Sequence, residues 1–175
     1  MLRPVRMSAT LDQRHLSFRQ AVTTLKHKGS HWRDVPANKQ RKVDTMIGYT
    51  MVGTNDLQRA KDFYNPLFDL MGLSPCYEDE QVASWGVRDD ETVPRFFACY
   101  PYDGNPATVG NGAMNSFRVQ TASLVVDLFE QAISGGGREE GRPGFRPERY
   151  GDKFFVAYVR DPVSNKLAFA CYDGK

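Results

Sequence analysis

The sequence predicts an α+β fold built from two tandem modules, and two observations support that prediction. The tetrapeptide FACY occurs twice, at Phe97–Tyr100 and Phe169–Tyr172, and each copy closes a strand-like segment. Amphipathic stripes over 57–71 and 124–133 each follow another strand-like segment. Each half therefore reads as strand, helix and then further strands, and a repeated order of this kind indicates duplication of one module.

The first module is expected over residues 46–104. The segment MIGYTMVGT predicts its opening strand, and Asn55 with Gln58 three residues later forms a capping-box pattern that predicts the start of a helix. Gly72 is expected to end this helix. Pro66 is expected to kink or break it, because an interior proline costs about 3 kcal/mol. The segments SPCYED, VASWGV and RFFACY predict three more strands.

The second module is expected over residues 113–175, after a connector at 101–112 that is rich in Gly, Pro and Asn. The segment AMNSFRV predicts its first strand, Ser123 is expected to cap its helix, and the run Gly135–Gly137 is expected to end it. The segment GREEGRPGFRPERYGD predicts a long polar loop. KFFVAYVR and KLAFACY predict the last two strands.

Charge divides the chain into two parts. Residues 1–45 hold ten Lys or Arg and three Asp, a net charge of +7, whereas residues 46–175 hold thirteen Lys or Arg and eighteen Asp or Glu, a net charge of −5. We expect residues 1–45 to be a basic, disordered N-terminal extension; a mitochondrial-type targeting segment, or upstream sequence outside the working protein, are alternatives. No apolar run approaches the roughly 20 residues of a membrane span.

The histidines and cysteines restrict the possible chemistry. All three histidines lie in the extension: His15, His27 and His31. The cysteines are odd in number and have no CxxC spacing: Cys76, Cys99 and Cys171. This pattern favours a reduced setting, so a cytoplasmic location is expected. Residues 46–175 contain no histidine to act as a base and no G-x-S-x-G elbow, which disfavours nucleophilic catalysis.

Three motifs in order carry a family resemblance over residues 46–173. The first motif is similar to an opening strand and helix, MIGYTMVGTNDLQRAKDFY. The second is similar to an inter-module connector, PYDGNPATVGNG, and the third to a terminal hairpin turn, AYVRDPVSNKL. Together they resemble the vicinal oxygen chelate superfamily of glyoxalases, extradiol dioxygenases and bleomycin- or fosfomycin-resistance proteins. The resemblance implies paired βαβββ modules whose sheets curl around one cleft, usually completed in a homodimer.

The resemblance also implies a divalent metal held in the cleft by His and Glu from equivalent strands of both modules. The first His position falls on Tyr49, and its counterpart falls on Met114 or its neighbour Asn115. The Glu positions fall on Ala168 and, aligned through FACY, on Phe96. None of these side chains is an imidazole or a carboxylate, the ligands that such metals take. We therefore expect no metal and no other cofactor.

Side chains alternate between the two faces of a strand, so these positions predict which residues line the cleft. The predicted ligand-binding residues are Tyr49, Met51, Phe96, Tyr100, Met114, Ser116, Arg118 and Ala168. The same alternation turns Phe97 and Cys99 toward the helix. An aromatic and apolar lining with phenol groups and one guanidinium suits a small amphipathic or anionic molecule, with Arg118 as the clamp for its anionic group.

The sequence therefore predicts metal-independent binding of a small molecule, with no specific nucleic-acid or membrane partner and a homodimer as the expected assembly. One alternative is a glyoxalase-type lyase or isomerase, or a dioxygenase, that uses a relocated metal or an acid–base pair. Another is a scaffold whose cleft is filled by Tyr49, Phe96 and Tyr100. Neither the ligand nor any catalytic residue follows from the sequence.

Overall fold

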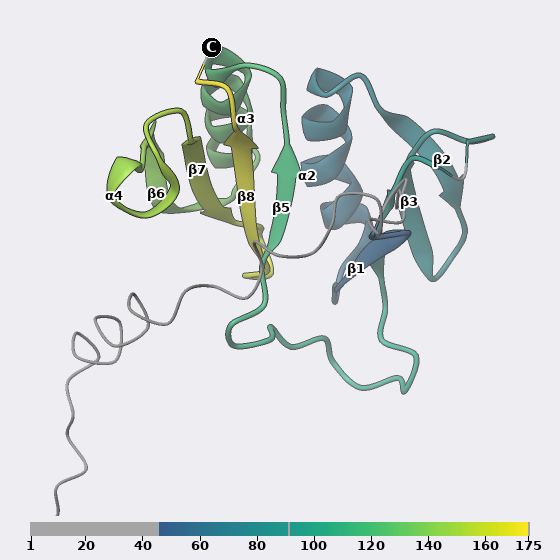
Figure 1. Cartoon of the computed structure of the whole chain (residues 1–175). Helices are drawn as coiled ribbons and strands as arrows, with labels where there is room; N and C mark the ends of the chain where they lie inside the picture. The colour runs from purple at the N-terminus through teal and green to yellow at the C-terminus, as the bar shows by residue number, and fades with distance from the viewer. Residues whose placement is uncertain (1–45, 91, 175) are drawn as a thin grey trace, which may run out of the picture. The chain divides into compact units, whose positions relative to one another are not determined.

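The computed structural model describes residues 46–90 and 92–174, and the extension expected over residues 1–45 lies outside them. The first half comprises β1 (Tyr49–Gly53), α2 (Leu57–Leu70), β2 (Ser74–Glu78), β3 (Val82–Gly86) and β4 (Arg95–Cys99) (Figure 1). The second half comprises β5 (Asn115–Arg118), α3 (Ala122–Ser134), β6 (Arg138–Phe145), α4 (Pro147–Tyr150), β7 (Phe155–Arg160) and β8 (Lys166–Cys171). Within the described ranges, no helix is long and apolar enough to cross a membrane.

Each half forms its own four-stranded mixed sheet. The strand orders are β1-β4-β3-β2 and β5-β8-β7-β6. In both sheets the first strand runs parallel to the last one of its module, and the other pairs are antiparallel. This arrangement confirms the α+β fold with two βαβββ modules. It also leaves β1 and β5 as edge strands, each hydrogen-bonded to a neighbour on one side only.

Both long helices begin at a side chain that accepts a hydrogen bond from the backbone N–H three residues on. Asp56 does so for α2 at 2.9 Å, and Thr121 does so for α3 at 3.1 Å. The caps predicted at Asn55 and Ser123 are therefore wrong by one and two residues. Asn55 instead pairs with the backbone of Ala107, accepting from its N–H at 2.6 Å and donating to its carbonyl at 3.1 Å, which anchors the connector.

Helix α2 continues through Pro66, so the predicted kink or break at this residue does not end the helix. Leu67 and Phe68, the next two residues, are 2 % and 3 % exposed. Their burial offsets the roughly 3 kcal/mol that an interior proline costs. The helix ends at Leu70, and Gly72 follows with φ 71°, a left-handed conformation that favours glycine.

The long polar loop predicted in the second module is the main error of the secondary-structure prediction. That segment forms β6, an edge strand that pairs with β7 through two register shifts, and the short helix α4. Its glycines and charged side chains hide the alternation that marks a strand in a sequence. They suit an edge strand that has no neighbour on its outer side.

One hydrophobic core serves both modules. Buried residues of α2, α3 and both sheets form a single cluster that includes Phe63, Tyr64, Leu128 and Phe169. Helices α2 and α3 contact each other within it (Figure 1). We call the sheet faces turned away from these helices the open faces.

A buried polar contact crosses this core from one module to the other. The hydroxyl of Tyr64 in α2 donates to Oδ2 of Asp161, in the turn between β7 and β8, at 2.8 Å. The two residues are 1 % and 4 % exposed. Burial, together with the Asp161 carboxylate, raises the pKa of Tyr64 well above its usual value, so the phenol keeps the proton that it donates.

Tyr64→Phe is expected to lower the free energy of unfolding by about 1–3 kcal/mol, because it removes a donor from a buried carboxylate. Tyr77→Phe is the matched control, since the Tyr77 hydroxyl donates to Asp79 at 2.7 Å on the exposed surface. That control should cost less than about 0.5 kcal/mol. Urea denaturation of both variants measures the difference, and equal losses would show that the inter-module contact is not stabilising.

Candidate functional site

The strand registers fix which residues of the two modules are equivalent. Met51 lies opposite Phe97, and Ser116 lies opposite Ala168. The helix caps Asp56 and Thr121 are equivalent residues, and they are 65 residues apart (121 − 56 = 65). Met51 and Ser116 have the same spacing (116 − 51 = 65), so they are equivalent positions of the two first strands. Phe97 is therefore the counterpart of Ala168, at a spacing of 168 − 97 = 71 residues, whereas the two FACY copies are 169 − 97 = 72 residues apart.

Because FACY is out of register by one residue, the faces predicted for the last strand of module one are wrong. Phe96 is 3 % exposed, and its ring centroid lies 4.9 Å from that of Tyr64 in α2. The Tyr100 hydroxyl accepts a hydrogen bond from the Leu57 N–H at 3.2 Å. Both side chains therefore face the helix, and Phe97 takes the opposite face.

The open face of module one carries the other predicted residues. Tyr49 packs edge-on against Phe97 with ring centroids 5.6 Å apart. Met51 shares this face because it pairs with Phe97 in register. Tyr49 is 65 % exposed and Met51 is 51 % exposed, so both are accessible.

In module two the predicted faces agree with the structure. Ala168 and Ala170 form a small buried cluster with Val156, separate from the main core to which Phe169 belongs. Ser116 pairs with Ala168 and is exposed. The Arg118 guanidinium carbon lies 5.3 Å from the centre of the Tyr172 ring, on the same face.

The residues at the family's metal positions do not fit a divalent metal ion. With the corrected register these positions hold Tyr49, Phe97, Met114 and Ala168. They offer a phenol, a thioether and two side chains with no donor atom, instead of imidazole nitrogens and carboxylate oxygens. Across the described residues, no group of three or more His, Cys, Asp or Glu is placed to hold a metal elsewhere.

A cavity of about 530 Å³ lies between the edge strands β1 and β5, and we call it the seam cavity. Its aromatic wall comprises Phe68, Trp85, Phe96 and Phe117. Phe117 of module two lies 5.4 Å from Phe68 and 5.2 Å from Phe96, measured between ring centroids. The volume falls within the range of roughly 300–1,000 Å³ that is typical of ligand sites.

The charged groups of the seam cavity are all cationic. Arg95 and Arg118 line it, and none of its described lining residues is Asp or Glu. Arg95 is already engaged, because its guanidinium donates to the carbonyl of Arg88 at 2.6 Å. Arg118 has no ion pair within the described part of the chain, and its side chain rests over Tyr172.

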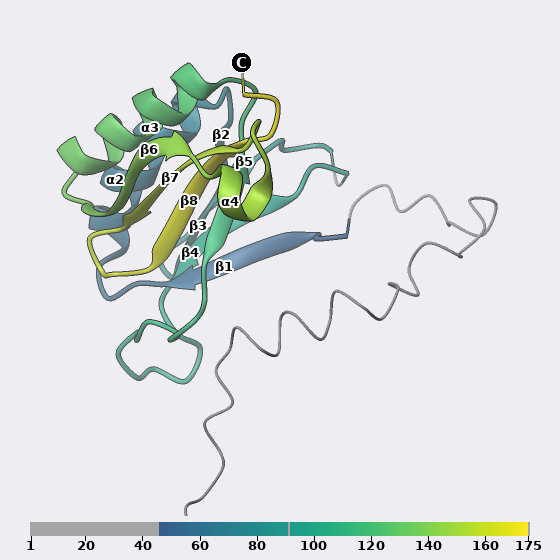
Figure 2. The same ribbon diagram turned by 60° about the vertical axis from the view of Figure 1, so that its left-hand side comes forward.

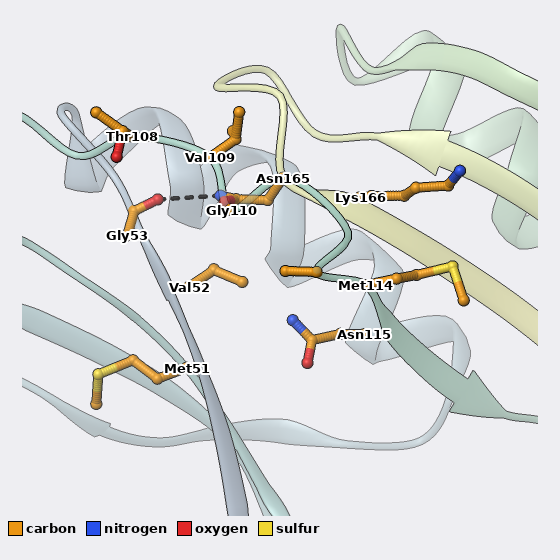
Figure 3. Close-up of a pocket in the computed structure, with 11 residues that line it drawn as sticks. Met51, Val52, Gly53, Thr108, Val109, Gly110, Met114, Asn115, Asn165 and Lys166 are labelled. Atoms are coloured by element: carbon orange, nitrogen blue, oxygen red, sulfur yellow. Dashed lines mark hydrogen bonds between the residues drawn. The ribbon is translucent and has the colours of Figure 1, made fainter. Parts of the chain in front are cut away.

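A second, smaller cavity of about 160 Å³ lies where β1 meets the connector (Figure 3). Met51 from β1, Met114 and Asn115 line it together with the connector residues Thr108–Gly110. Asn165 closes one side by donating to the Gly53 carbonyl at 3.0 Å. The connector therefore closes the space between β1 and β5 at the end where β1 finishes, near Gly53.

The structure divides the predicted ligand-binding set. Phe96, Met114, Ser116 and Arg118 line the seam cavity. Met51 lines the connector cavity, whereas Tyr49, Tyr100 and Ala168 line neither. The sequence prediction missed Phe97 as the counterpart of Ala168. The first residues of the two last strands could have indicated this pairing. Arg95 and Lys166 both begin the last strand of their module, and 166 − 95 = 71, the structural spacing.

Comparison with solved structures identifies similar proteins. The chain is 32 % identical to a glyoxalase/bleomycin resistance protein from Albidiferax ferrireducens, with a TM-score of 0.65 over 73 % of this chain and 98 % of that one. A glyoxalase-related enzyme from Fulvimarina pelagi matches at 18 % identity and a TM-score of 0.57, over 73 % of this chain and 88 % of that one. A lactoylglutathione lyase from Agrobacterium tumefaciens matches at 17 % identity and a TM-score of 0.52, over 75 % and 96 %. No family model and no curated protein matches the sequence.

The corrected register can be tested with a pair of adjacent substitutions. Phe96→Ala is expected to lower the free energy of unfolding by about 3–5 kcal/mol, because it leaves a cavity in the core. Phe97→Ala should cost less than about 2 kcal/mol, since this ring is only half-buried on the open face. Denaturant titration measures both, and the reverse order would support the register that FACY suggests.

Proposed function

The chain belongs to the glyoxalase/bleomycin resistance protein/dioxygenase family, the vicinal oxygen chelate superfamily, and from that premise we propose that it binds a small amphipathic or anionic molecule without a metal ion. The observation that supports this function best is the seam cavity, which combines an aromatic wall with Arg118, an arginine that has no ion-pair partner among the described residues. Binding sites for small molecules are mostly apolar, with a few placed polar groups.

The aromatic wall favours a ligand with a flat apolar part. Phe68 and Trp85 are stacked at an interplanar angle of 15°, with ring centroids 5.3 Å apart. The indole N–H of Trp85 donates to Asn65 at 2.8 Å, which fixes the orientation of its ring. Because packing already fixes this wall, a ligand that binds beside it orders few side chains and costs little side-chain entropy.

Arg118 favours an anionic group on that ligand. Its guanidinium lies over the exposed ring of Tyr172 and is paired with no carboxylate among the described residues. A carboxylate or phosphate could take both N–H groups of the guanidinium fork at once. Leaving the ring of Tyr172 would cost Arg118 only a cation–π contact of about 0.5–1 kcal/mol at an exposed site.

Metal independence rests on the donor set at the family's metal positions. Tyr49, Phe97, Met114 and Ala168 cannot supply the imidazole and carboxylate ligands of a divalent metal. We therefore derive no reaction step that passes through such an ion.

The alternative of a glyoxalase-type lyase or isomerase, or of a dioxygenase, needs a base or a relocated metal near the ligand. None of the described residues that line the seam cavity is His, Asp or Glu. Binding without turnover therefore has the better support. The homodimer and the cytoplasmic location remain predictions, although the exposed side chains of Tyr49 and Met51 are of the kind that a second copy would cover.

The test uses anilinonaphthalene sulfonate, a planar aromatic anion, as the probe. In a Trp32→Phe background Trp85 is the single tryptophan, so energy transfer from Trp85 to the dye reports binding to the domain of residues 46–175, and substitutions then locate the site. Saturable binding of one dye per chain is expected. Thr50→Phe should weaken it by about tenfold or more, because Thr50 lines the cavity and the larger side chain fills it.

Thr108→Phe is the matched control, because Thr108 is exposed on the connector and does not line the seam cavity. Its affinity for the dye should stay within about twofold of the parent. Equal weakening by both substitutions, or dye binding without energy transfer from Trp85, would contradict a site in the seam cavity. The melting temperature of each variant confirms that it is folded.

A further inference from the structure

The last turn of the connector places an asparagine directly before a glycine. The turn is closed by the Ala113 N–H, which donates to the Gly110 carbonyl at 3.1 Å. Asn111 and Gly112 occupy its two central positions, and Gly112 has φ 87°, a left-handed conformation that favours glycine at the third position of a turn. Both residues are exposed, and Figure 2 shows the connector as a loop that projects beyond the start of β5.

The backbone nitrogen of Gly112 is accessible to the side chain of Asn111. Among the described residues the Gly112 N–H makes no hydrogen bond. Apart from its chain neighbours, no heavy atom lies within 4 Å of the position that a Cβ on Gly112 would take. Gly104 follows Asp103 in the same connector but differs, because its N–H donates to the Pro101 carbonyl at 3.1 Å. Nothing in the described structure therefore engages or shields the Gly112 nitrogen.

The other asparagines of residues 46–175 lack this arrangement. Asn65 and Asn105 each precede a proline, which has no backbone N–H. The side-chain amides of Asn55 and Asn165 are held by hydrogen bonds to backbone groups. Asn115 lies in β5, where pairing with β8 restrains the backbone. Asn111 alone among them combines an exposed amide with a free, unhindered nitrogen on the next residue.

The surroundings of Asn111 would stabilise a negative charge. Asn111 lines a cavity of about 490 Å³ together with Arg160 and Lys166. The Glu140 carboxylate lies 2.6 Å from Nε of Arg160 and 3.6 Å from Nζ of Lys166, and Arg138 also pairs with it at 3.3 Å. Three cations thus share one carboxylate. A second carboxylate, formed at residue 111, would be attracted to this excess of positive charge.

We propose that Asn111 is a site of spontaneous deamidation, which converts its neutral amide into a carboxylate at the cavity that Arg160 and Lys166 line. The modification lowers the net charge of the chain by one unit and needs no enzyme. It does not depend on the function proposed for the seam cavity.

The reaction uses only the chain and water. The Gly112 nitrogen bonds to Cγ of Asn111, the bond from Cγ to the amide nitrogen breaks, and that nitrogen leaves as ammonia with the proton from Gly112. Water then opens the cyclic imide. Opening at Cγ gives Asp, whereas opening at the main-chain carbonyl gives isoaspartate, in which the main chain runs through the former side chain. One water enters, one ammonia leaves, and nothing is oxidised or reduced.

Incubation of the full chain at neutral pH, followed by trypsin digestion and tandem mass spectrometry, tests the proposal. Asn105 is the internal control, because it is also exposed on the connector and lies in the same tryptic peptide, between Arg95 and Arg118. Asn111 is expected to convert at least about tenfold faster than Asn105, since the proline after Asn105 has no N–H. The rate should rise with pH, because the attacking nitrogen must lose its proton.

Asn111→Gln is the matched variant, because it keeps an amide but would have to form a larger, less favourable ring. The acidic species that accumulates in the parent on ion exchange should not form in it. Equal conversion of Asn105 and Asn111 would show direct attack by water and overturn the proposal. An Asn111 amide that stays intact, or an acidic species that forms equally fast in Asn111→Gln, would also overturn it.

Discussion

The buried carboxylate of Asp161 is the constraint on which the relation between the two modules depends. It accepts from the Tyr64 hydroxyl of module one and, within its own turn, from the backbone N–H groups of Val163 and Asn165 and from the Asn165 amide. Four donors compensate a charge that would otherwise be very costly to bury. Because those donors come from both modules, the Asp161 carboxylate has its full set of hydrogen bonds only when the two modules are in contact.

The turn between β7 and β8, which holds Asp161, also contacts the end of β1 in the other module. The Asn165 amide that donates to Asp161 also donates to the carbonyl of Gly53, at the end of β1. This hydrogen bond occupies a backbone acceptor of the β1 edge. The strands β1 and β5 belong to different sheets and do not pair with each other. The seam cavity lies between them, and side chains of Phe68, Trp85, Phe96 and Phe117 form its wall.

The sequence was sufficient to predict the order of the elements but not their register. Periodicity and turn residues depend on local chemistry, so both helices and most strands could be located from them. The face of each residue in β4 depends on pairing with β1, which is a long-range property. The identical FACY letters suggested an alignment that is one residue away from the structural one, and a shift of one residue reverses the face of every side chain in a strand.

The candidate site could likewise be predicted only where it depends on local sequence patterns. Ser116 and Arg118 could be placed on one face of β5, with Met114 just before the strand, because alternation along a single strand is local. Phe68 and Phe117 lie far apart in the chain, and only packing between the modules brings them to one cavity. Likewise β6 was hidden in the sequence, because Gly141 and Gly144 break the alternation of the strand. A Cβ at Gly141 would lie 3.0 Å from the ring of Tyr158, and one at Gly144 would lie 2.8 Å from Nη1 of Arg146.

The most direct test of the account is the metal content of protein purified without chelators, measured by mass spectrometry in a variant with His15, His27 and His31 changed to Ala. Those changes exclude metal bound through the extension. The account predicts far less than one metal ion per chain, and no change in melting temperature on addition of Ni, Zn, Fe(II) or Mn. One metal ion per chain, or stabilisation by one of these metals that Tyr49→Phe or Met114→Leu abolishes, would contradict it.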